Sequence, residues 1–280
     1  MKVEKLQVDD LKTANSFAES WNNLPRGSIY SKGQFEDWLD PITKEQIENK
    51  TVLELGCGNA SLMVHLSSWQ PAFLKGIDLG DSVNSAKKNM SMLAFKNWEI
   101  EKSDLVTFVS SGFDLVYCIG VLHHLKNPKS GLDAVIRNTK IGGRFHCWVY
   151  AKEGNNLVIY LVDPLRKVVS RLPWWIIKYF VATPLAVPFF LYSRLVSSLP
   201  RVAFIKKLPL FQYSLWIAKR EFTFFRHVAF DQLVTPRTTY LSYEIISNWL
   251  KCYDEVDQDS TYIIMRNGNS WKFGGKIKDQ

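Results

Sequence analysis

The chain has 280 residues, of which 46% are hydrophobic and 22% charged, and its net charge is +8. This length allows one large domain, or a domain with a substantial insertion, around an extensive core. The cysteines lack the spacing of metal ligands, which argues against a metal site and favours free thiols in a reducing cytosol: Cys57, Cys118, Cys147 and Cys252.

The N-terminal stretch begins polar and then becomes aromatic. Met1–Asp10 lacks the apolar segment of a cleavable signal, so we expect a cytoplasmic protein. Ala14–Pro41 carries aromatic residues in a helix-loop-helix pattern, with Tyr30 in the loop between the two helices. Packing of these helices against a sheet accounts for most of these aromatic side chains.

Val52–Ala60, with the sequence VLELGCGNA, is an apolar run that ends in an acid and breaks into closely spaced glycines. This pattern is typical of a buried parallel strand that turns tightly beneath a nucleotide-like cofactor. Gly56 and Gly58 allow the backbone to turn and to approach a ligand where a Cβ would clash. Glu54 places a carboxylate at the carboxyl end of the strand, where open α/β sheets bind their ligands.

Four further strand-like runs follow, and helix-like stretches lie between them. Their period of about 25 residues predicts a doubly wound parallel sheet. Asp78 ends the second strand, where an acid can accept hydrogen bonds from both hydroxyls of a ribose, and Ser103 and Asp104 follow the third. The expected strands are Phe73–Asp78, Trp98–Lys102, Phe113–Ile119 and Arg144–Tyr150, and the helices between them include Asp81–Met92 and Lys129–Thr139.

Five motifs over about residues 50–150 resemble, in order and spacing, those of the class I S-adenosylmethionine-dependent methyltransferases. They are ELGCGNA at Glu54–Ala60, GIDL at Gly76–Leu79, SDL at Ser103–Leu105, FDLVYCIGVLHHLKNP at Phe113–Pro128 and IGG at Ile141–Gly143. The LHHL segment is similar to that of bacterial methyltransferases of ubiquinone and menaquinone synthesis. The chain departs from the family at Ala60, where a third glycine is usual.

The resemblance implies a Rossmann-like sheet of seven strands, a C-terminal antiparallel hairpin and S-adenosylmethionine as the cofactor. It also implies that residues 1–50 form a helical cap over the 51–150 core, with Tyr30 near the substrate. A redox dinucleotide protein is the main competitor, but it would prefer GxGxxG spacing and would not require the Phe113–Pro128 segment. The implied cofactor-binding residues are Glu54, Gly56, Cys57, Gly58, Asp78, Leu79, Ser103, Asp104, Ile119 and Gly120.

Methyl transfer to an oxygen requires alignment with the departing sulfur, exclusion of water and removal of a proton, for which a histidine is suited near pH 7. His123 and His124 follow the fourth strand at the ligand-binding edge, and we expect one of them to pack or cap the next helix. Tyr150, Glu153 and Asn155 follow the fifth strand at the same edge and form a second acceptor-side group. These residues favour O-methylation of a small or amphiphilic acceptor; N-methylation, RNA methylation and cofactor binding without turnover remain alternatives.

Residues 151–235 separate the fifth strand from the next helix–strand unit, and we expect them to form a helical insertion. Within 151–230 there are 12 Lys and Arg, 3 Asp and Glu, and 16 of the chain's 38 aromatic residues. Three interpretations compete: a buried lid, a lid whose outer face lies in a membrane interface, and a membrane-spanning helix. Lys178, Pro184 and Pro188 interrupt the apolar run Trp174–Tyr192, which disfavours spanning.

The same insertion indicates possible partners. Tryptophan, leucine and phenylalanine beside basic residues suit the anionic inner face of a membrane, to which the protein would bind peripherally. Basic and aromatic residues can also bind nucleic acid, but the long aliphatic runs make that partner less favoured. An apolar roof over the acceptor pocket would favour a hydrophobic or lipid-linked acceptor.

Residues 236–280 are expected to complete the sheet. Tyr240–Cys252 predicts an amphipathic helix with Ser242 as its N-cap. Before this helix, Asp231 and Arg237 either face the acceptor, with Arg237 as a substrate-binding residue, or pair with each other at the surface. The strands expected in this region are Glu255–Asp259, Tyr262–Asn267 and Ser270–Lys276.

Overall fold

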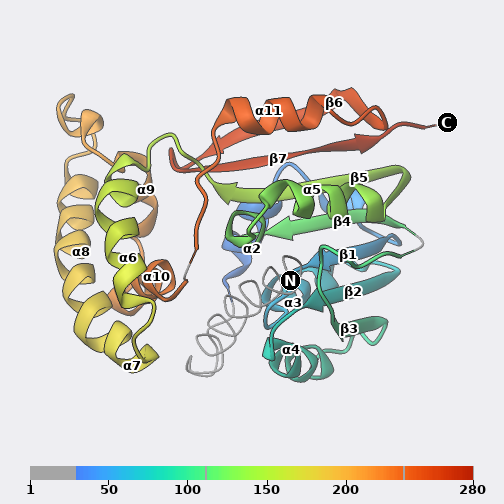
Figure 1. The fold of residues 1–280 in the computed structure, drawn as a ribbon, viewed down its shortest axis with the longest axis horizontal. Helices are drawn as coiled ribbons and strands as arrows, with labels where there is room; N and C mark the ends of the chain where they lie inside the picture. The colour runs from blue at the N-terminus through green and yellow to red at the C-terminus, as the bar shows by residue number, and fades with distance from the viewer. Residues whose placement is uncertain (1–29, 111, 236, 280) are drawn as a thin grey trace, which may run out of the picture.

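The computed structural model describes residues 30–110, 112–235 and 237–279, and its sheet has seven strands in the order β3-β2-β1-β4-β5-β7-β6 (Figure 1). The first five strands are parallel, whereas β7 runs antiparallel to both β5 and β6. The strands are β1 (Thr51–Leu55), β2 (Phe73–Asp78), β3 (Trp98–Lys102), β4 (Phe113–Ile119), β5 (Thr139–Tyr150), β6 (Val256–Arg266) and β7 (Ser270–Ile277). The doubly wound sheet and the C-terminal antiparallel hairpin are confirmed.

Helices cover both faces of the sheet. Helix α5 starts where its sequence provides both start signals: the Asn127 side chain accepts a hydrogen bond from the Lys129 amide, and Pro128 occupies the first turn. Ser242 caps α11 in the predicted way, accepting from the Ile245 amide. The elements beside the sheet are α2 (Lys32–Leu39), η1 (Lys44–Gln46), α3 (Ser61–Leu66), η2 (Ser67–Trp69), α4 (Ser82–Ser91), η3 (Leu122–His124), α5 (Pro128–Asn138) and α11 (Tyr243–Lys251).

The core has one layer on each face of the sheet. On one face Leu132 of α5 and Ile246 of α11 pack against strand residues such as Phe145. On the other face Phe35 of α2 and Met63 of α3 belong to a second buried cluster. These layers hold the carboxyl ends of β1 and β4 side by side, at the point where the strand order reverses. In doubly wound sheets that reversal opens a crevice for ligands.

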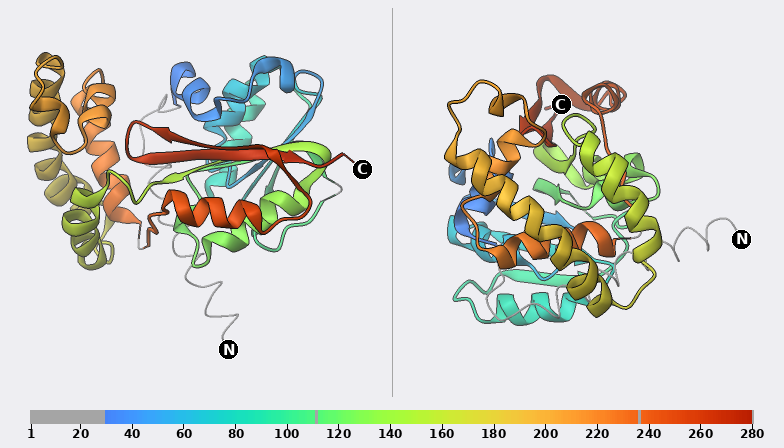
Figure 2. Two further views of the ribbon diagram at one scale, coloured as in Figure 1. Left: turned by 90° about the horizontal axis from the view of Figure 1, so that it is seen from above. Right: turned by 90° about the vertical axis from the view of Figure 1, so that its left-hand side faces the viewer.

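The insertion after β5 forms a separate helical layer beside one end of the sheet (Figures 1 and 2). It has two small apolar clusters of its own, one around Phe230 and Leu233 and the other around Ile217 and Phe225. Its elements are η4 (Val158–Val162), α6 (Asp163–Val169), α7 (Trp174–Ile176), η5 (Ile177–Ala182), α8 (Thr183–Ser198), η6 (Ile205–Lys207), α9 (Phe211–Ile217) and α10 (Phe222–Val234).

One helix of this layer is continuous from Trp174 to Ser198 and, by length and composition alone, could cross a membrane. An 18-residue window within it has a mean hydropathy of 1.4, and 17% of that window is buried. Pro184 lies in the first turn of α8 and Pro188 inside it, yet neither ends the helix. The η5 segment before them is a π-helix, the kind of local adjustment that relieves such positions.

Two details differ from the sequence prediction. Glu255–Asp259 and Tyr262–Asn267 were expected as separate strands, but β6 runs through both, with a register shift between Asp257 and Tyr262. At this irregularity the Ser260 hydroxyl oxygen accepts a hydrogen bond from the Lys276 amide at 2.8 Å, which keeps the strand attached to β7. Residues 1–29 of the predicted cap, with Phe17 and Trp21, lie outside the described residues.

Candidate active site

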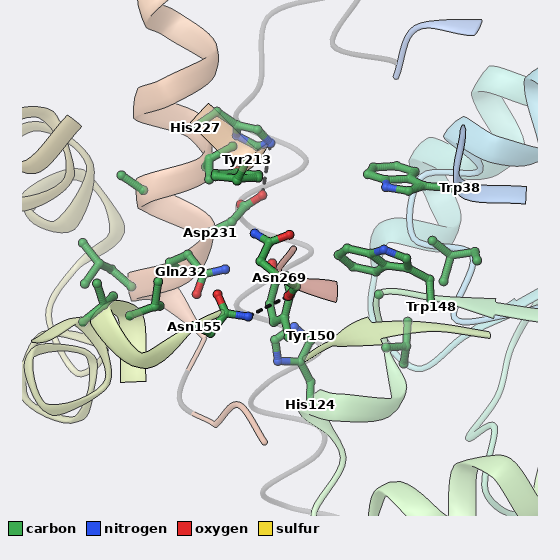
Figure 3. Close-up of a pocket in the computed structure, with 18 of the residues that line it drawn as sticks. Trp38, His124, Trp148, Tyr150, Asn155, Tyr213, His227, Asp231, Gln232 and Asn269 are labelled. Carbon is green, nitrogen blue, oxygen red and sulfur yellow. Dashed lines mark hydrogen bonds and ion pairs between the residues drawn. The ribbon is translucent and has the colours of Figure 1, made fainter. Parts of the chain in front are cut away.

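A cavity of about 770 Å³ lies at the carboxyl ends of β1 and β4, between the sheet and the helical layer (Figure 3). Its size is within the range of small-molecule sites. The sequence-predicted residues that line it are Tyr30, Glu54, Gly56, Cys57, Gly58, Asp78, Leu79, Asp104, Ile119, Gly120, His124, Tyr150 and Asn155. Four others are described by the structure but are not part of the lining: Ser103, His123, Glu153 and Arg237.

The turn after β1 requires glycine for two reasons. Gly56 has a φ of +82°, and a Cβ there would lie 2.4 Å from Cγ2 of Val121 in the loop after β4. The amides of Gly56 and Cys57 both donate to the carbonyl oxygen of Ile77, at 2.8 and 2.9 Å. Ala60 occupies the place of the usual third glycine and adopts the left-handed conformation itself, with a φ of +62°. Alanine is therefore accommodated there with some backbone strain.

Glu54 is a buried acid at the floor of the cavity. One of its carboxyl oxygens accepts a hydrogen bond from the Tyr117 hydroxyl at 2.8 Å. Burial raises the pKa of Glu54 to about 8, against the stabilising hydrogen bond from Tyr117, and nearby Asp78 raises it further. The carboxyl is thus poised to lose its proton when a positively charged group of a ligand binds beside it.

Asp78 is fixed by three hydrogen bonds from the chain itself. Its carboxylate accepts from the amides of Gly58 and Gly80 at 2.9 and 2.8 Å, and from the Ser82 hydroxyl at 3.0 Å. Burial nevertheless raises the pKa of Asp78. A carboxylate offers about four acceptor positions. Acceptance of both ribose hydroxyls, as the sequence suggested, would therefore require exchange of one of these internal bonds.

Asp104 and Ser103 separate in their roles. Asp104 lines the cavity, and one of its carboxylate oxygens accepts a hydrogen bond from the Val106 amide at 2.9 Å. Ser103 lies outside the lining, and its amide donates to the Asp78 carbonyl at 2.9 Å. The structure thus assigns Ser103 to the support of the strand tips rather than to the cavity wall.

The two adjacent histidines also separate. His123 is buried outside the lining, and among the described residues neither of its ring nitrogens has a hydrogen-bond partner. Burial lowers the pKa of His123 well below its usual value. His124 lines the cavity, with its Nδ1 2.9 Å from the carbonyl oxygen of Arg237. Since a carbonyl can only accept, Nδ1 carries the hydrogen and Nε2 is the basic atom. Burial lowers the pKa of His124 to about 4, so its ring is neutral at pH 7.

Of the three candidates at and after the end of β5, Tyr150 and Asn155 line the cavity and Glu153 does not. Glu153 accepts hydrogen bonds from the Trp271 indole and the Tyr243 amide, both at 3.0 Å, so it joins β7 to the first turn of α11. This is a structural position, and the expected catalytic placement of Glu153 is not what the structure shows. Tyr150 lines the cavity, and burial raises its pKa, so it can serve as a phenol rather than as a base. Asn155 also lines the cavity; its amide donates to the carbonyls of Ala151 and Asn269 at 2.7 and 2.6 Å.

Of the two remaining substrate candidates, Tyr30 lies in the lining and Arg237 does not. The Tyr30 ring packs edge-on against Trp38, with the ring centroids 4.6 Å apart. Arg237 contributes to the site through its backbone, because its carbonyl oxygen positions His124. Asp231, the other residue of this segment, lines the cavity and lies 3.1 Å from Nε2 of His227.

The helical layer contributes three polar groups from one helix, of which only Asp231 was a candidate from the sequence. His227, Asp231 and Gln232 project from α10 toward the cavity, opposite Trp38 and Trp148 (Figure 3). His227 and Asp231 are four residues apart on one helix, a spacing that could have revealed the pair. The position of Gln232 depends on packing between distant segments, and the sequence around it carries no comparable local signal.

Arg166 is one of the basic residues of the insertion, and its side chain lies inside the helical layer. It is fully buried and donates to the Gln232 side chain and carbonyl, at 2.7 and 2.5 Å, and to Asp163 at 2.9 Å. A further bond to the Tyr240 hydroxyl spans 3.3 Å. Arg166 therefore ties α6 to the end of α10 and to the segment that leads back to the sheet.

The sheet side of the cavity fits the nucleotide-like cofactor expected from the sequence. Its glycine turn leaves space where a side chain would intrude, and Glu54, Asp78 and Asp104 present carboxyl groups within one continuous lining. These are the group types that bind hydroxyl and amino functions of such a ligand. The helical side offers instead aromatic and aliphatic walls with a few polar groups, which suits a second, less polar molecule.

Comparisons with known proteins match the part of the chain that contains strands β1 to β5. Residues 47–157 match the family model described as a methyltransferase domain. The tRNA U34 carboxymethyltransferase of Helicobacter acinonychis (strain Sheeba) is 30% identical over 138 residues, which cover 41% of this chain and 51% of that protein. The ubiquinone biosynthesis O-methyltransferase of Saccharophagus degradans is 26% identical over 156 residues, covering 51% of this chain and 63% of that protein. The chain thus spans about half the length of the first of these curated relatives.

A solved structure extends the likeness in fold beyond this segment. An O-methyltransferase family protein from Burkholderia thailandensis aligns over 89% of this chain and 57% of that chain. The TM-score is 0.53 and the sequence identity 10%, so the likeness concerns the fold alone.

Proposed function

From the premise that the core of this chain belongs to the class I S-adenosylmethionine-dependent methyltransferases, we propose that the protein methylates a hydroxyl group of an apolar or amphiphilic acceptor. The cofactor is S-adenosylmethionine, which supplies a methyl group already activated on a sulfonium. The residues that would hold it are those of the sheet side of the cavity, above all Glu54, Gly56 and Asp78. The chain's own task is to align the acceptor, exclude water and accept one proton.

The shape of the cavity supports an acceptor with a large apolar part. Trp38, Trp148 and Tyr150 form an aromatic wall beside the sheet, with the Trp148 and Tyr150 ring centroids 5.2 Å apart. Across from them, the helical layer adds aliphatic and aromatic side chains such as Leu161 and Phe189. A strongly polar acceptor would lose its hydration against such walls without gaining partners.

His124 is the residue that we assign to proton removal. Its Nδ1 hydrogen is committed to the Arg237 carbonyl, which fixes the tautomer and leaves Nε2 as the proton acceptor. The lowered pKa makes His124 a weak base, but it also keeps the ring neutral at pH 7. A weak base suffices because a hydroxyl becomes much more acidic as its oxygen forms the new bond to the methyl group. His227 and Asp231 lie across the cavity and can bind a polar group of the acceptor.

One observation carries the proposal: a single cavity joins the cofactor-type turn at Glu54–Gly58 to an aromatic and aliphatic compartment that contains His124. Relatives named for tRNA modification share the methyltransferase core, so RNA is the natural competing acceptor. The helical layer, however, exposes aliphatic and aromatic side chains, which are poor partners for a phosphate backbone.

The test is release of S-adenosylhomocysteine by the purified chain, with either a long-chain phenol in detergent micelles or bulk tRNA as the acceptor. We expect S-adenosylhomocysteine to be released when the phenol is the acceptor and not when tRNA is the acceptor. His124→Asn should lower kcat about 100-fold, the usual scale of a lost general base, and leave the KM for S-adenosylmethionine within about twofold. Glu153→Gln, at the other acid–base candidate from the sequence, is the matched control and should retain kcat. Release with tRNA alone would refute the assigned acceptor class.

A further inference from the structure

The solvent side of the long helix Trp174–Ser198 is apolar. On α8, Leu191 and Leu195 are 61% and 58% exposed, whereas Ser193 and Val196 on the other side of the same helix are buried. A helix on the surface of a soluble protein ordinarily presents polar residues to solvent. The outer face, as we name it, consists of Trp175, Tyr179, Phe180, Val187, Leu191 and Leu195.

The surroundings of the outer face are strongly basic. Residues 164–220 contain ten Lys and Arg and not one Asp or Glu. Lys178 lies on the same helix, with its Nζ 5.6 Å from the centre of the Trp174 ring, and Arg194 lies over Phe190 at 5.0 Å. Arg201, Lys206 and Lys207 follow the helix and are exposed. Apolar side chains bordered by cations match the boundary between the headgroups and acyl chains of an anionic bilayer.

The cavity reaches the same side of the molecule. Leu161 of η4 and Leu185 of α8 both line the cavity, yet they are 63% and 42% exposed. Pro188, one turn further along α8, is also exposed and in the lining. Apolar side chains of η4 and of the helix that carries the outer face therefore line the cavity and are exposed to solvent at the same time. Figure 2 shows α8 on the side of the helical layer that is turned away from the sheet.

We propose that the outer face docks on an anionic lipid bilayer, with the helix parallel to the surface, and that the acceptor enters the cavity from the bilayer between η4 and α8. The second half of this inference rests on the proposed function, whereas docking does not. Entry from the bilayer would restrict the class of acceptor to amphiphiles that reside in the membrane. The apolar part of such an acceptor passes Leu161 and Leu185 while its hydroxyl reaches His124.

Packing favours docking over spanning. The inner side of α8 contributes Ala186 to a buried cluster with Ile217 of α9 and Phe225 of α10. A spanning helix would have to leave these partners or draw α10 into the hydrocarbon together with its His227–Asp231 pair. Charged groups at that depth are costly, whereas a helix lying in the interface keeps its inner side packed on the protein.

Sedimentation with vesicles tests the docking directly. The full chain should sediment with vesicles of phosphatidylcholine and phosphatidylglycerol (3:1), bind pure phosphatidylcholine at least tenfold more weakly, and be released in 1 M salt, which screens the lysines and arginines. Leu191→Asp combined with Leu195→Asp should reduce binding at least tenfold. Met92→Asp combined with Val109→Asp is the matched control, because those side chains are 68% and 65% exposed but lie beside the sheet.

Calorimetric S-adenosylmethionine binding should be unchanged in both double variants, which shows that each is folded. Equal loss of vesicle binding in the two double variants would overturn the proposal. Equal binding of the wild-type protein to vesicles with and without phosphatidylglycerol would overturn it as well. Protein that stays with the membrane in 1 M salt and alkaline carbonate would overturn it in favour of spanning.

A second assay separates this inference from the proposed function. With a long-chain phenol embedded in the vesicles, Leu191→Asp with Leu195→Asp should lower turnover at least tenfold, yet leave turnover on a short, water-soluble phenol unchanged. Vesicle binding without methylation of either phenol would sustain the docking and refute the proposed function. Full turnover of the embedded phenol by this variant would refute entry from the bilayer.

Discussion

The two sides of the cavity are built in different ways. On the sheet side, backbone groups at strand ends hold each functional side chain: Asp78 is fixed by the amides of Gly58 and Gly80. On the helical side, side chains hold one another, as Arg166 does with Gln232 and Asp163. The sheet side has its core beneath it, whereas the helical layer has only small clusters and exposes much of its apolar surface.

This difference indicates a division of labour. A site fixed by strand ends is rigid and suits a cofactor whose form does not vary. A helical layer that is held by a few long-range contacts can change its sequence without disturbing the strand ends, and so can determine which acceptor is used. Changes on the sheet side should then affect binding of the cofactor, while changes in the helical layer should affect the acceptor alone.

The largest effect is expected from Gly56→Ala. The added methyl group would lie 2.4 Å from Cγ2 of Val121, at a backbone φ of +82°. We expect S-adenosylmethionine affinity, measured by calorimetry, to fall at least 100-fold, since the turn must move. Gly33→Ala is the matched control because a Cβ at Gly33 meets nothing within 4 Å. Vesicle binding by Gly56→Ala should persist. Loss of both S-adenosylmethionine binding and vesicle binding would show that the sheet side and the helical layer are not independent.

The same division explains what could be predicted from the sequence. The strand-end residues Glu54, Gly56 and Asp78 belong to short motifs, in which the local pattern of apolar run, acid and glycine determines the local structure. The bounds of β2, β3 and β4 also agree with the predicted runs. The central strand β4 is an almost continuous apolar stretch, whereas the edge strand β3 alternates apolar and charged residues before it ends in Lys102.

The helical side could not be predicted in this way. Arg166 and Gln232 are far apart in sequence, and their contact arises only after α6 and α10 have packed. Arginine is seldom fully buried, and four hydrogen bonds compensate the burial of Arg166. His123 and His124 are adjacent in one motif, and only the course of the chain around Arg237 shows which of them reaches the cavity.

An intermediate effect, this time on stability, is expected from Glu54→Gln. The pKa of Glu54 is about 8 in the folded protein and near 4.5 when unfolded, so the unfolded chain loses its proton first as the pH rises. Glu54 therefore destabilises the cofactor-free protein increasingly between pH 4.5 and 8. The glutamine side chain of the variant would keep an oxygen for the Tyr117 hydroxyl without this penalty.

Thermal denaturation without cofactor is the measurement for that variant. The melting temperature of Glu54→Gln should exceed that of the wild type at pH 8, by an amount equivalent to a few kcal/mol, and the difference should vanish toward pH 4.5. Addition of S-adenosylmethionine should reverse the order, because the variant lacks the carboxylate that a cationic ligand group stabilises. A difference that is constant with pH would exclude titration of Glu54 as its cause.

The smallest effect is expected from Glu153→Ala, and it distinguishes the structural from the catalytic interpretation of the group after β5. This side chain accepts from the Trp271 indole and the Tyr243 amide at 3.0 Å but does not line the cavity. Its removal should lower the free energy of unfolding by about 1 kcal/mol, the scale of a helix cap or of an exposed hydrogen bond. Because neither partner of Glu153 carries reacting atoms, kcat should stay within about twofold of the wild type.

Chemical denaturation followed by tryptophan fluorescence measures the free energy of unfolding of Glu153→Ala. Release of S-adenosylhomocysteine with the long-chain phenol as acceptor measures its kcat. A loss of kcat above tenfold at unchanged stability would return Glu153 to the acceptor site and place the end of β5, rather than the histidine after β4, at the proton transfer.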